Sequence, residues 1–192
     1  MDSNKLKQFF PQSPPVDLKL NVSDFACVSL IIRSKEEDYE LAFIRRAHNP
    51  KDAWSGHIAF PGGRKEDHDR DDLATSIRET FEEVGWSLSE NQFIGFLADI
   101  QARNKTGVLN FFLRPLAFYV EQGFAQTKLD PHEVDEVFWV SVKYLDDIRN
   151  RHPISIPGRG LNLPGIKLPS GDILWGLTYM ITQELLLKIN QE

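Results

Sequence analysis

The residues of this chain best suited to chemistry lie in one short stretch and comprise an arginine and three glutamates: Arg78, Glu79, Glu82 and Glu83. The glutamates have the spacing i, i+3 and i+4, which places them on one face of a helix, where their repulsion destabilises an isolated helix. A cation would offset that repulsion. Hard ions such as Mg²⁺ take carboxylate oxygens and are held together with substrate phosphates. The pattern therefore predicts a divalent-metal site that acts on phosphates.

The flanking residues predict that this stretch is a capped helix. Asp69, Asp71 and Asp72 crowd its start, where a side-chain oxygen can cap free backbone N–H groups. Gly85 stands where a C-terminal glycine stop is expected. The apolar residues recur at spacings of four and three, which predicts one face that buries against a sheet. They are Leu73, Ile77, Phe81 and Val84.

Most acidic clusters are solvated helix faces, and that alternative applies here as well. Against it, Arg78 directly precedes the acids, and backbone carbonyls of the upstream Gly62-Gly63 pair could approach an ion closely. Taken together, the glycine pair and the acidic helix resemble a known family. Phe60-Pro-Gly-Gly63 followed by Arg78-Glu79-Thr-Phe-Glu82-Glu83-Val-Gly85-Trp looks like the Nudix box, the signature of Mg²⁺-dependent hydrolases that cut nucleoside diphosphates linked to another group.

The resemblance implies a fold, a cofactor and residue roles. The fold is α/β (α+β), an α/β/α sandwich around a mixed β-sheet, and the cofactor is Mg²⁺ or Mn²⁺. Arg78 is then an orienting residue that pairs with a helix carboxylate. The general base could be Glu79, Glu133 or Glu136, or hydroxide formed on the metal. The implied metal ligands are the Gly63 carbonyl, Glu79, Glu82 and Glu83.

Two departures from the family pattern leave part of the site open. Fourteen residues separate Gly63 from Arg78, one more than the family pattern has, and Thr80 occupies a position that is usually apolar. The acidic residue expected in the loop could therefore be any of three: Glu66, Asp67 or Asp69. A spacing that is one residue longer resembles the pattern of the coenzyme A pyrophosphatase branch of the family.

A second pattern of that branch is matched in part. Leu41-Ala-Phe-Ile-Arg45 and Gly56 align with it, and Trp175-Gly-Leu-Thr178 resembles its C-terminal W-G-x-T. Arg46 replaces a serine and Asp52 replaces an arginine, at positions associated with coenzyme A recognition. Arg45 and Arg46 are either phosphate contacts or solvent-facing strand ends. The predicted substrate-binding residues are Arg45, Arg46, His57, Phe60 and Gly62.

Three functions compete on these grounds. The first is a diphosphatase that acts on coenzyme A-type nucleoside diphosphate derivatives. The second, favoured by Arg46 and Asp52, is a hydrolase of ADP-ribose, nucleotide sugars or dinucleoside polyphosphates. The third is a catalytically silent Nudix-fold binding protein, against which all three box glutamates are present.

Length and composition set wider limits. The 192 residues suit a lead-in over 1–24 and a single domain over 25–192. A net charge of −6 argues against a nucleic-acid-binding surface. Cys27 is the single cysteine, which suits a reducing compartment. No signal-peptide core or membrane span is evident, so a cytoplasmic protein without a membrane partner is expected, with a homodimer as a reasonable prior.

Hydrophobic patterning completes the expected elements. Strands are predicted at 25–33, 39–46, 57–60, 93–100 and 109–120, with Pro115 implying an edge or a bulge. Residues 101–107 are expected to form a polar loop, 143–149 a short helix and 151–169 a long ordered loop. Residues 174–189 have the apolar spacing of an amphipathic helix.

Overall fold

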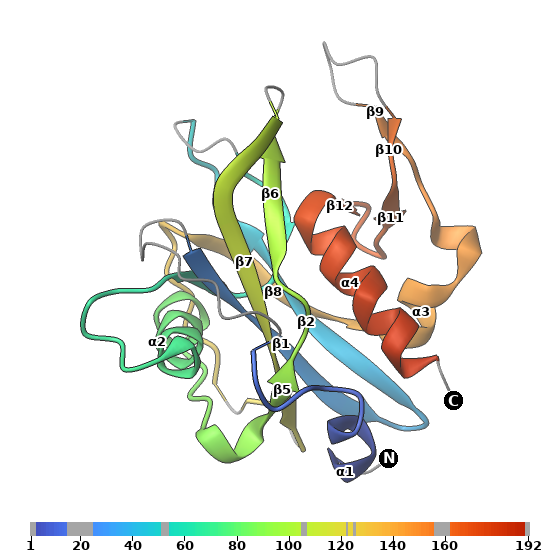
Figure 1. The fold of residues 1–192 in the computed structure, drawn as a ribbon. Coiled ribbons are helices and arrows are strands. Elements are labelled where there is room, and N and C mark those ends of the chain that lie inside the picture. Colours follow the sequence, from blue (N-terminus) through green and yellow to red (C-terminus); the bar gives the residue numbers. More distant parts are fainter. Residues whose placement is uncertain are drawn as a thin grey trace.

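The computed structural model describes residues 3–14, 25–50, 54–104, 107–121, 123–124, 126–155 and 162–190. A mixed β-sheet forms its centre and carries helices on both faces (Figure 1). Helix α2 (Asp72–Val84) covers one face, and α1 (Ser3–Lys7), α3 (Val142–Asp146) and α4 (Gly176–Ile189) lie on the other. The predicted α/β/α sandwich is confirmed. The main sheet consists of β1 (Phe25–Lys35), β2 (Asp38–Arg46), β3 (Ile58–Ala59), β4 (Gly62–Arg64), β5 (Phe93–Phe96), β6 (Ile100–Asn104), β7 (Gly107–Val120) and β8 (Val134–Ser141).

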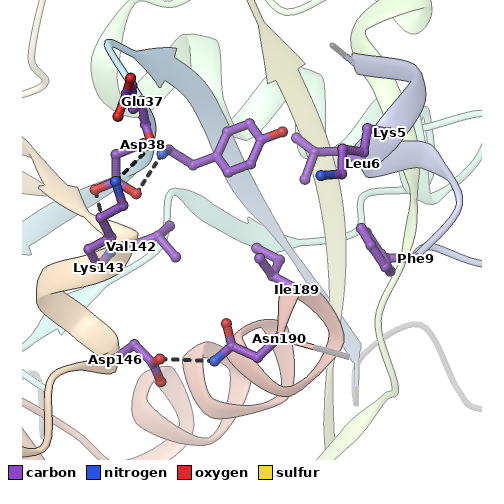
Figure 2. A pocket seen from close by; sticks show the side chains of 11 residues that line it. Lys5, Leu6, Phe9, Glu37, Asp38, Val142, Lys143, Asp146, Ile189 and Asn190 are labelled. Carbon is purple, nitrogen blue, oxygen red and sulfur yellow. Dashed lines mark hydrogen bonds between the residues drawn. The ribbon is translucent and has the colours of Figure 1, made fainter. Parts of the chain in front are cut away.

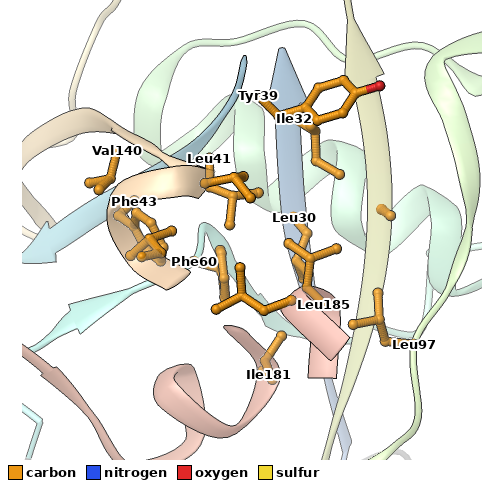
Figure 3. Close-up of a cluster of buried hydrophobic side chains, with 14 of the residues drawn as sticks. Leu30, Ile32, Tyr39, Leu41, Phe43, Phe60, Leu97, Val140, Ile181 and Leu185 are labelled. Atoms are coloured by element: carbon orange, nitrogen blue, oxygen red, sulfur yellow. The ribbon is translucent and has the colours of Figure 1, made fainter. Parts of the chain in front are cut away.

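The two central strands are apolar on both faces, because helices cover both sides of the sheet. Leu30 and Leu41 point toward α4, whereas Ile31 and Ala42 point toward α2. This alternation is the period of two expected of a strand. Figure 3 shows the cluster on the α4 side, where Ile181 and Leu185 of that helix meet strand residues such as Leu30. The predicted buried strands are confirmed.

Strand pairing brings the glycine turn next to the middle of the sheet. β1 runs parallel to β7 and antiparallel to β2 and β4. Within the short strand β4, Gly62 pairs with Val28 and Gly63 with Cys27. β3 pairs with the end of β2, where Arg45 lies opposite Ile58. The chain therefore passes from the edge strand β3 to the catalytic candidates of α2 through the turn at β4.

The region from 93 to 120 differs from the sequence prediction. The predicted strand 93–100 stops at Phe96, and most of the predicted polar loop is strand β6, which forms a hairpin with β7. Pro115 lies inside the sheet opposite Val28, not at an edge. On its other side β7 changes partner there, from β6 up to Leu113 to β5 from Leu116, so the missing N–H falls between two pairings.

The C-terminal third contains more strand than its glycines and prolines suggested. Short strands occupy the described parts of the predicted loop 151–169, and a 3₁₀ turn η3 (Ile148–Asn150) follows the short helix α3. The amphipathic helix begins at Gly176, two residues later than its apolar spacing suggested. The strands are β9 (Ile154–Ser155), β10 (Asn162–Leu163), β11 (Gly165–Lys167) and β12 (Ile173–Trp175).

The N-terminal segment packs onto the same core as α4. Leu6 is 1% exposed and Phe10 is 3% exposed, and Phe96 N–H donates to the Pro11 carbonyl at 2.9 Å. Residues 15–24 of the predicted lead-in lie outside the described residues. Within the described part of the chain, no helix combines the length and the apolarity needed to cross a bilayer.

Candidate active site

The helix that carries the candidate residues is capped as its sequence predicts. The Asp71 carboxylate accepts the N–H of Ala74 at 2.8 Å at the start of α2. Gly85 takes the left-handed conformation at its end, with φ 72°, and donates its N–H to the Phe81 carbonyl. Caps of this kind fix both ends of a short helix. The 3₁₀ turn η2 (Glu90–Gln92) follows before the chain enters β5.

The buried face of α2 is more polar than predicted. Phe81 is 56% exposed, so its assignment to the buried apolar face is wrong. Thr80 and Glu83, with the neighbouring Val84, face the sheet instead. Thr80 donates to the hydroxyl of Ser29 on β1 at 2.8 Å, and Ser29 donates to the Ser76 carbonyl. The helix can bury this face because the sheet supplies a hydrogen-bond partner, which explains a threonine at a usually apolar box position.

Arg78 is the hub of the site. Its Nη1 donates to Glu79 at 2.9 Å and to Glu82 at 2.8 Å. Its Nε and Nη2 reach both oxygens of Asp69 at 3.0 and 2.8 Å, and Nη2 also donates to the Arg64 carbonyl. This fork-to-fork geometry fixes a guanidinium in one orientation. Arg78 therefore holds the box helix against the preceding loop, consistent with the predicted orienting role.

Among the three loop acids that the sequence left open, Asp69 is the one that pairs with Arg78 bidentately. Its side chain is 3% exposed and also accepts the Glu66 N–H at 2.9 Å and the Thr75 hydroxyl at 3.1 Å. The Arg78 guanidinium, helped by these two donors, holds the pKa of Asp69 well below its usual range. Glu66 lies 4.0 Å from Arg78 and is 58% exposed. The sequence could not separate these residues, because the longer loop shifts the family register.

Glu83 lies at the inner end of the site, where it is 1% exposed. Burial raises its pKa to about 8, and the negative charges of Glu133 and Glu79 act in the same direction. The Gly62 N–H opposes this shift by donating to Glu83 Oε2 at 2.8 Å. Gly62 therefore positions a carboxylate through its backbone, and its φ of 149° and the Cys27 carbonyl leave no room for a side chain.

Glu79 packs directly against the second glycine of the turn. A Cβ atom on Gly63 would lie 2.3 Å from Glu79 Oε2, so any other residue at this position would have to displace the Glu79 carboxylate. Burial raises the pKa of Glu79 above its ordinary value despite the adjacent Arg78. Glu83, which is buried, and Glu79, which is partly buried, thus both have raised pKa values, and such a pair of carboxylates lacks compensating positive charge, which is the condition expected of a cation site.

Glu133, which follows the box by about fifty residues, joins this group. Its charge raises the pKa of both Glu79 and Glu83, and its carbonyl accepts the Ala47 N–H at 2.8 Å. Arg46 also faces the group, since its charge lowers the pKa of Glu83. We call Glu79, Glu82, Glu83 and Glu133 the acid cluster.

The acid cluster is not arranged as a finished coordination shell. Among the described residues, no three histidine, cysteine or carboxylate side chains converge as a metal-binding group. The reason lies in the hydrogen bonds: Arg78 holds oxygens of Glu79 and Glu82, and the Gly62 N–H holds an oxygen of Glu83. The donor set nevertheless fits a hard cation, because it offers carboxylate oxygens whose burial penalises their charge.

The predicted residues Arg45 and Glu136 are in a separate network. They lie opposite each other on β2 and β8 and form an ion pair of 2.7 Å. Arg45 also pairs with Asp135 at 3.4 Å and with Asp172 at 2.6 Å. Three carboxylates thus surround Arg45, and Glu136 points its charge at Arg45. The alternation of the strand explains the separation, because Arg45 and its neighbour Arg46 face opposite sides of the sheet.

Phe60 and His57, the other predicted substrate residues, occupy different environments. Phe60 is 3% exposed and stacks on Phe43 with ring centroids 4.8 Å apart, so its ring belongs to the core. His57 is half-buried, and its ring meets Trp175 in a T-shaped contact at 4.8 Å. Asp52 lies outside the described residues.

A small cavity at the other end of β2 is separate from this site (Figure 2). It has a volume of about 200 Å³ and is lined by residues of α1, the β1–β2 turn, α3 and the end of α4, among them Leu6, Asp38 and Ile189. From Asp38 to Arg46 the strand spans roughly 27 Å at about 3.4 Å per residue. The cavity therefore lies too far away to share a ligand with the acid cluster.

The geometry agrees with comparisons to known proteins. A family model described as NUDIX domain matches residues 25–157. The chain belongs to the Nudix family. The Nudix helix is thus α2, and the mixed sheet matches solved Nudix structures: a MutT/nudix family protein from Enterococcus faecalis superposes with a TM-score of 0.57, at 16% identity, over 96% of this chain and 68% of that chain.

Two Nudix relatives resemble the sequence more closely. Mitochondrial coenzyme A diphosphatase NUDT8 of Mus musculus is 31% identical over 137 residues, which cover 70% of this chain and 62% of that protein. The uncharacterized Nudix hydrolase NudL of Photorhabdus laumondii is 27% identical over 185 residues, 95% of each chain. The match thus spans less than two thirds of the mouse protein's length.

Proposed function

We propose that this Nudix protein is a pyrophosphatase that uses Mg²⁺ or Mn²⁺ to cleave the diphosphate linkage of a nucleoside diphosphate derivative. The observation that carries the proposal is the acid cluster, in which burial raises the pKa of the buried Glu83 and of the partly buried Glu79, and the charge of Glu133 acts in the same direction on both. Such a cluster is unfavourable unless cations and a substrate complete it. Its place on a glycine turn and a capped helix keeps it fixed.

The groups that would hold the ions are the Gly63 carbonyl, Glu79, Glu82 and Glu83. Glu82 is suited to this because its side chain is 53% exposed and reachable from solvent. When bound, the ions would neutralise the charge of the diphosphate and lower the pKa of a bound water. Arg78 would keep the carboxylates oriented through its bonds to Glu79 and Glu82.

Hydrolysis requires a proton acceptor, and we assign that role to Glu133. A water attacks one phosphorus, the bridging P–O bond breaks, and the proton of the water passes to a carboxylate. Glu133 is exposed and electrostatically coupled to Glu79 and Glu83, whereas Glu136 pairs with Arg45. Glu79 is less suited, because Arg78 holds its Oε1 at 2.9 Å and Gly63 confines it.

A matched pair of substitutions tests this assignment. Glu133→Gln should lower turnover by about a hundredfold. This is the low end of the 10² to 10⁴ range for general bases, because other carboxylates lie near enough to replace Glu133 in part. Glu136→Gln removes the same charge from the Arg45 network and should change turnover less than about fivefold. Steady-state kinetics at saturating metal measures both. Equal losses in the two variants, or a larger loss in Glu136→Gln, would contradict the role of Glu133.

Coenzyme A-type compounds are the first substrate class, supported by the similarity to a coenzyme A diphosphatase and by the partial branch motifs. One observation favours a second class. Arg46, which replaces the serine of the branch pattern, directs a positive charge toward Glu83. An added cation beside the acid cluster suits a substrate whose second phosphate carries a different group, as in ADP-ribose or a nucleotide sugar.

Product analysis decides between the classes. The purified protein is incubated with Mg²⁺, Mn²⁺ or EDTA and with coenzyme A, ADP-ribose, nucleotide sugars or diadenosine polyphosphates, and products are separated by chromatography. Metal-dependent release of 3′,5′-ADP and phosphopantetheine is the expected result. Preference for ADP-ribose or a nucleotide sugar would support the second class, and no cleavage of any compound would overturn the enzymatic proposal.

A further inference from the structure

The segment that follows the Nudix domain match returns to the edge of the site. The family model ends at residue 157, yet three contacts join the later segment to β2 and β3. Asp172 pairs with Arg45 at 2.6 Å, Trp175 meets the ring of His57, and the Thr178 hydroxyl donates to the Ile58 carbonyl at 3.0 Å. A segment outside the shared domain therefore contributes side chains at the β2–β3 edge of the sheet.

The ion pair between Arg45 and Asp172 holds this segment in place. Arg45 is 25% exposed and Asp172 is 30% exposed, and Asp172 Oδ2 also accepts the Ser170 hydroxyl at 2.6 Å. Because Asp135 and Glu136 share the same guanidinium, Arg45 has little charge left for a substrate phosphate. Its position explains instead how β12, which starts one residue after Asp172, is fixed against β2.

Trp175 ends β12, and its ring contacts His57, the residue just before the edge strand β3. Its partner His57 accepts the N–H of Arg46 through its carbonyl at 3.0 Å, and Arg46 is the cation that acts on Glu83. His57 also precedes Gly62 by five residues, so at most about 17 Å of extended chain separates them. A ribose joins base and diphosphate in a nucleoside diphosphate, so the two ends of such a substrate must bind apart from each other.

Half-buried aromatic rings at the edge of the sheet suit a planar group. Trp175 and His57 are each partly exposed, and their rings meet in a T-shaped contact. Stacking on an aromatic side chain is the sequence-tolerant way in which proteins bind a nucleobase. We propose that Trp175, supported by His57, stacks on the nucleobase of the substrate, and that Arg45 and Asp172 are positioning residues for it. This inference rests on the proposed function.

The test compares two ligands that differ only in the base. Adenosine 5′-monophosphate and ribose 5-phosphate are titrated against the full chain with Mg²⁺ present, and calorimetry measures each Kd. The wild type should bind the nucleotide roughly tenfold more tightly than the sugar phosphate. Trp175→Ala should remove this preference, and Trp175→Phe should keep most of it. Thermal melting confirms that each variant is folded.

A second tryptophan provides the matched control. Trp54 is 53% exposed and lies in the loop before His57, so Trp54→Ala should leave the preference unchanged. For the positioning residues, Asp172→Asn should reduce the preference and Asp172→Glu should restore part of it, a readout that lost stability alone would not move. The inference is overturned if the wild type shows no preference, if Trp175→Ala keeps it, or if Trp54→Ala removes it instead.

These results are separable from a failure of the proposed function. Cleavage of the substrate panel with an unchanged preference in Trp175→Ala leaves the enzyme standing and removes only the stacking site. Loss of the preference in Trp175→Ala without any cleavage keeps the stacking site and makes the chain a nucleotide-binding protein.

Discussion

Helix α2 connects two charge clusters that are built in opposite ways. At its first residue, Asp72 accepts from Arg114 at 2.6 Å and from Lys65 at 3.2 Å, while Asp99 holds the same Arg114 with both oxygens. Two carboxylates there meet two cations. Further along the helix, the four glutamates of the acid cluster share Arg78 and Arg46, and Asp69 also takes bonds from Arg78.

The difference shows what each cluster is for. Around Arg114, which is 8% exposed, every buried charge has an opposite partner, so the cluster fixes the start of the helix to β7. In the acid cluster, burial and repulsion raise the pKa of Glu83 to about 8. The negative charge of the acid cluster is therefore unfavourable in the free protein, as expected of a site that ligands complete. Substitutions in the first cluster should therefore affect stability, and those in the second should affect turnover.

The largest effect is expected at Arg114. Arg114→Met leaves Asp99, which is 4% exposed, and Asp72 without their guanidinium. Because removing one partner strands a buried charge, the free energy of unfolding should fall by about 3 kcal/mol in urea titrations. Turnover per folded molecule should stay within a few fold. The same change at Arg149, which is 86% exposed beside Asp147, is the control and should leave the free energy of unfolding nearly unchanged. Equal losses in both variants would remove the contrast.

The reverse pattern is expected at Glu83 and Glu82. Glu83→Gln and Glu82→Gln should each lower turnover by at least about a hundredfold, the scale of losing one electrostatic group in a transition state. Neither should lower the melting temperature, because a neutral amide relieves repulsion. Its carbonyl can still accept the Gly62 N–H at position 83 or the Arg78 N–H at position 82. Glu90→Gln, 66% exposed in a pair with Arg70, is the kinetic control. Near wild-type turnover in both Glu83→Gln and Glu82→Gln would contradict the assignment of the metal site.

Much of this arrangement was predictable from the sequence because it is local. The i, i+3, i+4 spacing and the Asp71 and Gly85 caps fix the helix and its glutamates from one short stretch. The alternating apolar residues of β1 and β2 likewise fix strands covered on both faces. Each of these features depends on residues close together in the chain.

The errors arise where distant segments decide the outcome. Phe81 was expected inside, but Ser29 of β1 offers a hydrogen bond that makes Thr80 the buried residue. Arg45 suggested either a phosphate contact or a solvent-facing strand end, and neither alternative includes Asp172, which lies 127 residues later and pairs with it. Pro115 suggested an edge or a bulge, and only the change of partner along β7 shows that its missing N–H falls between two pairings. Spacing within a segment carries no information on such partners.

The smallest of the expected effects concerns Asp69, which links the acid cluster to the loop before it. Its folded-state pKa is depressed well below the ordinary 3.8, first by Arg78. A depressed carboxyl pKa stabilises the fold above the unfolded-state value and loses that contribution as pH falls toward the folded-state value. Asp69→Asn should therefore lower the free energy of unfolding by about 2 kcal/mol at pH 7. The difference in free energy of unfolding between Asp69→Asn and the wild type should be constant above about pH 5 and narrow below pH 4, as denaturant titrations across pH would measure.

The control is Glu66→Gln, at 58% exposure, which should change the free energy of unfolding by under about 0.5 kcal/mol at every pH. A gap that widened on acidification would mean that Asp69 is held in its protonated form, and Arg78 would then be available to the box glutamates alone.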